Sequence, residues 1–345
     1  MQGKIRGLRK ILKDKKANAL FLHWKDPNHK WLLGEKLEDS FVLVRKTGKP
    51  LLFISPLESF KSKKFRVVIM GRDLKKRISS YKIKRLAVNN SFFTLKHKEF
   101  FGKASFVDVS KDLLKIRSVK DESEIRKIRK ACTYTVKCFN ELIRAWKKKQ
   151  FKHELDVVRF IKRFALDNDL GLAFEPIVAS GKNACVPHHS KHTTLNKGFC
   201  VVDFGFEYKG YNSDMTRTLY IGKPSEEERE YYDLVRSVQE SCVEMVEPGV
   251  LGRDLNDSAV KMLGDKARFF VHSLGHGIGV EVHEKPGISG SSEEFLVEGM
   301  VLTVEPGVYI HRKRVGIRIE DTILVSRKGF VNLTRSASKN LVIVV

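Results

Sequence analysis

The sequence predicts an α+β protein with two domains, on the strength of three observations. Its 345 residues are enough for two hydrophobic cores. Between residues 19 and 88, short apolar segments of strand length alternate with helical patterns, which indicates a small α/β domain with a mixed sheet. After a long charged amphipathic stretch, the chain changes at Phe174 to apolar strand-like segments interrupted by glycines and polar residues. We place the two domains at residues 1–115 and 116–345.

The first domain is predicted to open with an amphipathic helix over residues 4–15, because its apolar residues recur at helical spacing. Five strand candidates follow, at residues 19–22, 41–44, 50–54, 66–70 and 85–88. No cluster of His, Cys, Asp and Glu occurs in this part of the sequence. We therefore interpret the first domain as a scaffold, a cap or a dimer surface.

The second domain is predicted to begin with a long helix within residues 118–149. Acidic residues at 121–124 stand where the start of a helix favours them, and an apolar stripe at helical spacing follows. Further helices are predicted at residues 153–170, 225–245 and 254–266, and strands at residues 301–305 and 316–325. No repeat with a period of about 20–50 residues occurs, which excludes a solenoid.

The composition and the cysteine pattern limit where this protein can act. No apolar run reaches the roughly 18–20 residues that a membrane-spanning helix needs, and the chain does not start with the apolar core of a signal peptide. The five cysteines are odd in number, scattered and never spaced as Cys-x-x-Cys, which argues against a disulfide framework and a zinc ribbon. We expect a reduced, cytoplasmic compartment and no membrane partner.

The formal net charge of +24 raises the question of a nucleic-acid partner, since Lys and Arg neutralise phosphates in such complexes. The basic residues are spread along the chain, and only residues 147–149 form a compact run. No zinc finger, helix-turn-helix or base-stacking aromatic motif accompanies them. We favour a solvated basic surface over a specific nucleic-acid interface, and the charge alone does not define the function.

Two aspartates stand in apolar, strand-like surroundings, Asp203 within residues 201–205 and Asp214 within residues 210–217. A buried carboxylate is costly unless a partner compensates its lost hydration, and a metal ion can do so. The two residues are eleven positions apart, with a Lys-Gly turn between them. This spacing fits two adjacent antiparallel strands that present both side chains to one cavity.

A glycine-rich segment further along the chain contains His272, His276 and His283 within twelve residues. Glycines on both sides of His276 free the backbone, so that the imidazole could approach an ion or a substrate closely. A single histidine in an apolar segment is more often a core residue with its hydrogen bonds satisfied. Three histidines among glycines favour ligands or catalytic groups instead.

Two more carboxylates follow in strand-like segments. Glu305 ends an apolar strand at a Pro-Gly turn, whereas Glu247, in the same tripeptide, follows a charged helix and is interpreted as a helix-end residue. In residues 316–323 the period of two places Arg318 and Glu320 on one face of a strand. A guanidinium there can hold carboxylates and lower their pKa; the alternative is an ordinary cross-strand ion pair.

The ordered set Asp203, Asp214, His276, Glu305 and Glu320, with its surrounding glycines, resembles the pita-bread metallopeptidases. That family comprises Xaa-Pro aminopeptidases, Xaa-Pro dipeptidases (prolidases), methionine aminopeptidases and the metal-free creatinases. The resemblance covers essentially the whole chain. Residues 116–345 resemble the pita-bread catalytic domain and residues 1–115 the creatinase-type N-terminal domain, which argues against a methionine aminopeptidase.

The resemblance implies two divalent metal ions. Asp203 would bind one ion alone, Asp214 and Glu320 would bridge both, and His276 with Glu305 would complete the shell of the other. Oxygen ligands with a single imidazole suit manganese, which we expect, or cobalt, zinc or iron.

The remaining roles are also implied by the resemblance, as follows. His188 matches the histidine on the substrate side, His283 the one near the scissile carbonyl, and Glu305 manages the proton of a metal-bridging hydroxide. Arg318 and Tyr309 would support the ligands, and His272 and Tyr309 would line the substrate pocket. His189 directly follows His188, and Pro187 favours His188 as the residue that faces the substrate.

The expected reaction is the hydrolysis of Xaa-Pro bonds at the N-termini of proline-containing peptides. Xaa-Pro aminopeptidase and Xaa-Pro dipeptidase share every motif quoted above, so both stay open. The alternatives are a metal-free creatinase-like hydrolase and a non-catalytic pita-bread binding module. The resemblance further implies a homodimer.

Overall fold

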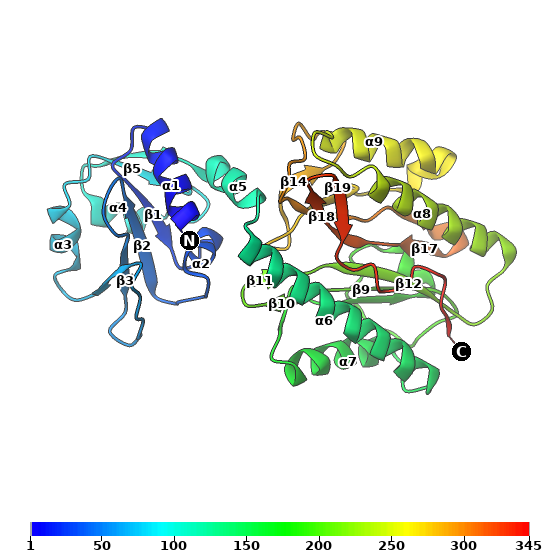
Figure 1. The fold of residues 1–345 in the computed structure, drawn as a ribbon. Helices are drawn as coiled ribbons and strands as arrows, with labels where there is room; N and C mark the ends of the chain where they lie inside the picture. The colour runs from blue at the N-terminus through cyan, green and yellow to red at the C-terminus, as the bar shows by residue number, and fades with distance from the viewer. Residues whose placement is uncertain (1, 345) are drawn as a thin grey trace. The chain divides into compact units, whose positions relative to one another are not determined.

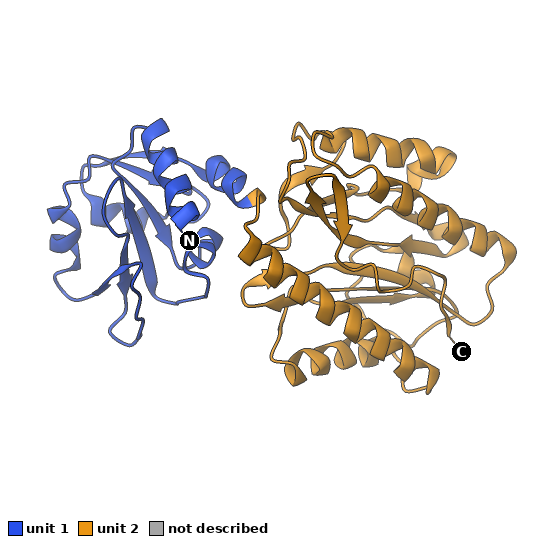
Figure 2. Ribbon diagram, viewed as in Figure 1, with its two compact units in different colours: residues 1–117 blue, residues 118–345 orange. Residues whose placement is uncertain are grey.

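The computed structural model describes residues 2–344. The chain divides into two compact units, residues 1–117 and residues 118–345, coloured separately in Figure 2. Each unit combines helices with β-sheets, so the predicted α+β class is confirmed. Among residues 2–344, no helix combines the length and the apolar character needed to cross a membrane.

The first unit is built on one six-stranded mixed sheet with the strand order β4-β3-β2-β1-β5-β6. Its strands are β1 (Ala19–His23), β2 (Ser40–Arg45), β3 (Leu51–Ile54), β4 (Arg66–Ile69), β5 (Arg85–Val88) and β6 (Ser105–Asp108). The pairs β1–β2 and β2–β3 are antiparallel, whereas β3–β4, β1–β5 and β5–β6 are parallel. The predicted mixed sheet is therefore confirmed, with β6 as an edge strand that the sequence pattern did not reveal.

Between residues 2 and 118, five helices precede, connect or follow the strands of this sheet. They are α1 (Gln2–Asp14), α2 (Pro27–Leu33), α3 (Leu74–Ser80), α4 (Leu95–Phe101) and α5 (Ser110–Ser118). Helix α1 is the predicted amphipathic helix, and its apolar face with Leu8, Ile11 and Leu12 is buried. The central strands β1, β2 and β3 are buried over most of their length, which explains their continuous apolar runs.

The second unit has four α-helices in two pairs, at opposite sides of its sheets (Figure 1). They are α6 (Glu122–Lys147), α7 (Glu154–Asp167), α8 (Glu226–Glu244) and α9 (Gly252–Leu263). Helix α6 starts at a capping box, where the Asp121 side chain accepts hydrogen bonds from the backbone N–H groups of Ser123 and Glu124. The predicted long helix is therefore confirmed, with its start at residue 122.

The strands of the second unit form four sheets. A four-stranded sheet has the order β20-β12-β9-β8, with β8 (Ile177–Ser180), β9 (Gly198–Phe204), β12 (Met215–Ile221) and β20 (Ile343–Val344). A five-stranded sheet has the order β14-β13-β15-β18-β19, with β13 (Gly275–Gly277), β14 (Glu284–Ile288), β15 (Val301–Val304), β18 (Asp321–Ser326) and β19 (Gly329–Asn332). A three-stranded sheet has the order β11-β10-β7, with β7 (Gly171–Leu172), β10 (Phe206–Tyr208) and β11 (Tyr211–Asn212). A two-stranded sheet pairs β16 (Gly307–Ile310) with β17 (Val315–Arg318).

Three 3₁₀ turns complete this unit, η1 (Gly181–Cys185), η2 (Gly264–Phe269) and η3 (His311–Lys313). Two hydrophobic cores hold the layers together. Residues of α6 and α7 pack on the sheet that contains β8, β9 and β12, and residues of α8 and α9 pack on the sheet that contains β15 and β18. The second of these cores also contains Phe199, Val201 and Tyr220 of β9 and β12, so it joins the two large sheets as well.

The single strand predicted at residues 316–325 is wrong, because the chain forms two strands there. β17 pairs with β16 and ends at Arg318, and β18 pairs with β15 from Asp321 onward. Between them, the backbone N–H of Glu320 donates to the carbonyl of Thr216, 3.1 Å away. Glu320 thus lies where the chain passes from one sheet to another, and not within a regular strand.

Strands β9 and β12 are antiparallel neighbours, as the spacing of the two aspartates predicted, with Asp203 opposite Thr216. The chain leaves this pair after Phe204, and β10 and β11 form a separate hairpin around the Lys-Gly turn. Gly205 makes this departure possible, because a Cβ at that position would lie only 1.8 Å from the carbonyl oxygen of Ser213.

Replacing Gly205 with Ala should therefore destabilise the second unit by at least about 2 kcal/mol, a typical effect of forced overpacking. Urea unfolding followed by circular dichroism measures this change. Gly3→Ala is the matched control: a Cβ there has nothing within 4 Å, and helix α1 should gain slightly. Equal stability of the two variants would contradict the close approach at Gly205.

Candidate metal centre

Five of the predicted site residues come from segments far apart in the sequence and line one pocket of about 550 Å³. Asp203 lies in β9, Asp214 just before β12, His276 in β13, Glu305 just after β15, and Glu320 between β17 and β18. The same pocket is lined by four other predicted residues, His188, His272, His283 and Arg318. Tyr309 does not line it directly and lies behind it, in β16.

Asp214, His276 and Glu320 each offer one ligand atom within 4.8 Å of the others. The Nε2 atom of His276 lies 3.7 Å from Asp214 Oδ2 and 3.3 Å from Glu305 Oε1. Its Nδ1 atom lies 3.1 Å from the carbonyl oxygen of Gly277 and can donate to it. This hydrogen bond orients the ring with Nε2 toward the carboxylates, the arrangement that a metal-binding histidine needs.

Among the described residues that line this pocket, three buried carboxylate oxygens receive no hydrogen bond. They are Asp203 Oδ1, Asp214 Oδ1 and Glu320 Oε1. A buried carboxylate without a partner is strongly destabilising, and a bound cation removes that cost. These oxygens, together with one imidazole, fit divalent metal ions of the first transition series.

The pKa values in this cluster reflect its crowded negative charge. Burial, followed by repulsion from neighbouring carboxylates, raises the pKa of Asp214 and of Glu320 well above the usual range. Burial lowers the pKa of His276, but the hydrogen bond to Glu305 and the charges of Glu305 and Asp214 outweigh it and raise it to about 9. Without divalent ions the cluster therefore retains protons at neutral pH.

Glu305 differs from the other carboxylates. Burial raises the pKa of its carboxyl group, but the hydrogen bond and the charge of His276 lower it more, so the net shift is downward. Glu305 is accordingly ionised at neutral pH. An ionised carboxylate beside the pocket can accept a proton from a reacting molecule.

Close backbone packing explains the glycines on both sides of His276. A Cβ at Gly275 would lie 2.0 Å from the carbonyl oxygen of Thr303, and one at Gly277 would lie 2.2 Å from that of Lys285. Strand β13 therefore fits between β14 and β15 only with glycines at these positions. This packing holds the imidazole of His276 in place.

Arg318 fixes the carboxylate of Asp203. Its Nη2 atom donates to Asp203 Oδ2 at 2.5 Å, and its Nη1 atom donates to the hydroxyl of Tyr309 at 2.9 Å. The same hydroxyl lies 2.9 Å from His272 Nε2. The guanidinium thus contacts Asp203, and Glu320 instead accepts a hydrogen bond from the hydroxyl of Thr216 at 2.7 Å.

The two adjacent histidines after η1 have different surroundings. His188 lines the pocket, whereas Nε2 of His189 lies 3.3 Å from the carboxylate of Glu154, which is fully buried. Glu154 also accepts hydrogen bonds from the backbone N–H groups of Ser180 and Thr193, at 2.7 and 2.8 Å. It therefore organises the loop that carries His188, a role that the sequence did not suggest.

His283 lines the same pocket beside His276, with the two ring centroids 4.2 Å apart in an edge-to-face arrangement. Burial, and then the charge of His276, lowers the pKa of His283. Its imidazole is therefore neutral at neutral pH. A neutral imidazole can donate a hydrogen bond to an oxygen on which negative charge develops.

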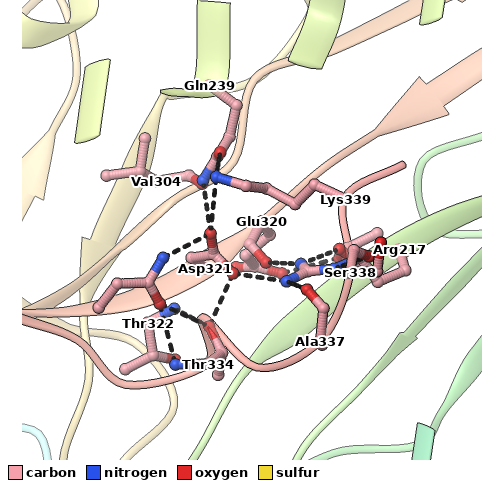
Figure 3. Close-up of polar contacts among 12 residues, drawn as sticks. Arg217, Gln239, Val304, Glu320, Asp321, Thr322, Thr334, Ala337, Ser338 and Lys339 are labelled. Carbon is pink, nitrogen blue, oxygen red and sulfur yellow. Dashed lines mark hydrogen bonds and ion pairs between the residues drawn. The ribbon is translucent and has the colours of Figure 1, made fainter. Parts of the chain in front are cut away.

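A second network, absent from the sequence-based prediction, connects Arg217, Asp321 and the backbone of Glu320 (Figure 3). The guanidinium of Arg217 is buried and donates to the carbonyl oxygens of Glu320 and Thr216 at 2.5 and 3.0 Å. It also donates to Asp321 Oδ1 at 2.7 Å and to the carbonyl of Ala337 at 2.9 Å. Arg217 thereby joins two ligand-bearing segments to the C-terminal part of the chain.

Asp321 balances this buried guanidinium. Its carboxylate accepts hydrogen bonds from Gln239 at 3.2 Å, Asn332 at 2.8 Å and Thr334 at 2.8 Å, and Lys339 lies 3.5 Å away. Burial raises the pKa of Asp321, but Arg217 and Lys339 outweigh it and hold the pKa far below the usual range. The sequence does contain a signal for this network: Arg217 and Asp321 are charged residues inside otherwise apolar strand segments.

Comparison with known proteins gives two family matches. Residues 126–327 match metallopeptidase family M24, and residues 4–119 match the creatinase/prolidase N-terminal domain. The chain is 34% identical to the Xaa-Pro dipeptidase of Pyrococcus horikoshii over 336 residues, which cover 94% of each chain. These matches confirm the resemblance to the pita-bread peptidases.

Solved structures agree with this relationship. The Xaa-Pro dipeptidase from Bacillus anthracis has a TM-score of 0.90 at 27% identity and 99% coverage of both chains. The prolidase from Pyrococcus horikoshii has a TM-score of 0.87 at 30% identity, with 99% of this chain and 100% of that chain covered. The X-Pro aminopeptidase from Thermotoga maritima has a TM-score of 0.86 at 29% identity, with coverage of 95% and 98%.

Binding of a divalent ion should release at least about one proton near pH 7, since the raised pKa values leave protons on the free site. Isothermal titration calorimetry in buffers of different ionisation enthalpy measures this release. On titration with the ion, Asp214→Asn should release fewer protons or fail to bind the ion. The control Asp233→Asn, at an exposed position of α8, should bind the ion and release protons as the unaltered protein does. A heat of binding that does not depend on the buffer would contradict the raised pKa values.

Asp321→Asn should lower the free energy of unfolding by about 3 kcal/mol at neutral pH, because Arg217 is left buried without its carboxylate. Since the folded pKa of Asp321 is depressed, its contribution is present above the ordinary value of 3.8 and is lost as pH falls below it. Urea unfolding at neutral and acidic pH, with a chelator present, measures both effects. The variant should lose less stability than the unaltered protein on acidification; equal losses would exclude this role for Asp321.

Proposed function

The chain belongs to metallopeptidase family M24, and on this premise we propose that it hydrolyses Xaa-Pro bonds at the N-termini of peptides. As a metallopeptidase, it uses divalent metal ions. The observation that carries the proposal is the pocket in which ligand-type side chains converge around three buried carboxylate oxygens without partners. Relatives named Xaa-Pro dipeptidase and X-Pro aminopeptidase, similar over nearly the whole chain, supply the substrate class.

We further propose that two ions bind, with manganese as the first candidate and cobalt, zinc or iron as the others. Asp203, Asp214, His276, Glu305 and Glu320 are the residues that would hold the two ions. The four carboxylates offset the charge of two divalent ions, which supports this number. When bound, such ions polarise the scissile carbonyl and make water nucleophilic near neutral pH.

The side chains of the pocket perform the remaining steps. Glu305, ionised at neutral pH, accepts a proton from the attacking water and passes it to the leaving proline nitrogen. His283 donates a hydrogen bond to the carbonyl oxygen as negative charge develops on it. His188 lines the same pocket and would contact the substrate there.

The supporting residues keep this arrangement rigid. Arg318 keeps Asp203 oriented by donating to one of its oxygens, which leaves the other oxygen for an ion. Tyr309 links Arg318 to His272, and these two contacts fix the pocket wall that the substrate meets. A rigid wall favours correct placement of the reacting bond.

Xaa-Pro dipeptidase is our first candidate, because a relative of that name is 34% identical to this chain. Xaa-Pro aminopeptidase is the second, because an X-Pro aminopeptidase structure is similar at 29% identity. A metal-free creatinase-like hydrolase or a binding module is disfavoured by the ligand-type residue at all five positions. We also propose a cytoplasmic homodimer with domains at residues 1–115 and 116–345. The five buried cysteines, none in a disulfide, agree with a reducing compartment.

An activity panel tests the function. Purified protein is assayed with Xaa-Pro dipeptides, longer Xaa-Pro peptides and matched Xaa-Ala peptides, each with manganese, cobalt, zinc or iron. We expect cleavage of the Xaa-Pro substrates only; cleavage of dipeptides alone selects the dipeptidase. Asp214→Asn should lower kcat/KM by at least about 1000-fold, because the metal supplies several kcal/mol of transition-state stabilisation.

The control for this experiment is Asp233→Asn, which makes the same chemical change on exposed α8 and should leave kcat/KM unaltered. Circular dichroism establishes that both variants fold. Full activity of Asp214→Asn would refute its role as a ligand. Absence of Xaa-Pro cleavage with every metal in the folded, unaltered protein would refute the proposed function.

A further inference from the structure

The division of the chain into two units shows that its positive charge is distributed very unequally. Residues 1–117 contain 30 Lys and Arg against 10 Asp and Glu, a formal net charge of +20 out of +24 for the chain. Residues 118–345 contain 35 Lys and Arg against 31 Asp and Glu, a net charge of +4. Basic residues occur along the whole chain, as the sequence analysis states, but their excess over acidic residues lies mostly in the first unit.

Part of this charge surrounds a hollow of about 650 Å³ in the first unit. The hollow lies at the end of the sheet where β2 turns into β3 and where β4 begins, beside the first turns of α1. Its charged lining is entirely cationic: Arg6, Arg9, Lys49, Lys63 and Lys64. Gln2, Ile5, Gly48 and Pro50 complete it.

The five cations have no carboxylate partner among residues 2–344. Arg9 is the one that the backbone holds in place, since its guanidinium donates to the carbonyl oxygens of Arg45 and Gly48. The other four side chains are exposed. Cations gathered in a concave site without compensating acids repel one another, and an anion in the hollow removes that repulsion.

We propose that this hollow, which we call the cationic hollow, binds the phosphate backbone of nucleic acid without sequence specificity. Several positive side chains around a concave surface suit successive phosphate groups of one strand. The excess charge of the first unit extends far beyond the five lining residues, so a polymer satisfies more of it than a small phosphate compound would. The candidate metal pocket belongs to the second unit, and this proposal does not require it.

An anionic membrane surface fits this site less well. Membrane-binding faces combine cations with exposed apolar side chains that enter the lipid. In the cationic hollow, the apolar lining residues Ile5 and Pro50 are not exposed, and the apolar face of α1 is buried in the core of its own unit. The hollow therefore has cations and no apolar group to insert.

Fluorescence anisotropy with a labelled single-stranded RNA of about 20 nucleotides, titrated with full-length protein at several salt concentrations, tests the proposal. We expect binding that weakens linearly in log K against log salt. In the double variant Lys63→Gln, Lys64→Gln, the salt slope should fall by about 1.4, because each lost phosphate contact on a single strand contributes about 0.7.

The matched control is Lys147→Gln, Lys148→Gln, which removes the same charge from the exposed end of α6 in the second unit. It should keep the slope, and both double variants should keep the peptidase activity. No binding at about 50 mM salt, equal losses in the two variants, or binding only to phosphatidylserine vesicles or tripolyphosphate would each overturn the proposal. This readout does not depend on Xaa-Pro cleavage, so the two proposals fail separately.

Discussion

The burial of four carboxylates around one pocket is the constraint on which the second unit depends. Asp203, Asp214, Glu305 and Glu320 repel one another at short range, and burial removes the water that would screen them. The protein supplies two cationic groups, Arg318 and His276, which compensate only part of this charge. Divalent ions supply the remainder, so the same electrostatic imbalance that opposes folding of the empty site favours metal binding.

Support for this centre comes from both sides of the sheets. Arg318 acts on the substrate side, where it holds Asp203 and the hydroxyl of Tyr309. Arg217 acts on the opposite side, where it holds the backbone of Glu320 and, through Asp321, the C-terminal segment (Figure 3). Arg318 forms an ion pair with Asp203, and Arg217 forms one with Asp321. Their remaining N–H groups donate to oxygens that position the site, such as the Tyr309 hydroxyl and the Glu320 carbonyl. Residues 337–339 are thereby coupled to the candidate metal centre, although none of them lines the pocket.

The two units have different electrostatic characters. The second unit is nearly balanced overall and concentrates negative charge in its pocket, whereas the first is acid-poor and carries most of the net charge. A divalent cation and a phosphate backbone would therefore be attracted to different units of one molecule. The charge of the whole chain is misleading, because it is the sum of a nearly balanced unit (+4) and a strongly basic one (+20).

The sequence by itself determined the class of the fold, the family and the order of the candidate metal-ligand residues, because residue types and local periodicity can be read without coordinates. It identified the pocket residues through their neighbours, such as the glycines around His276 and the Pro-Gly turn after Glu305. Only the tertiary structure decided that Glu320 lies in a break between two strands, that His188 and not His189 faces the pocket, and that Arg217 and Glu154 support the site. These features depend on contacts between segments as much as about 100 positions apart, whose pairing follows from packing of the whole chain and leaves no local periodic signal.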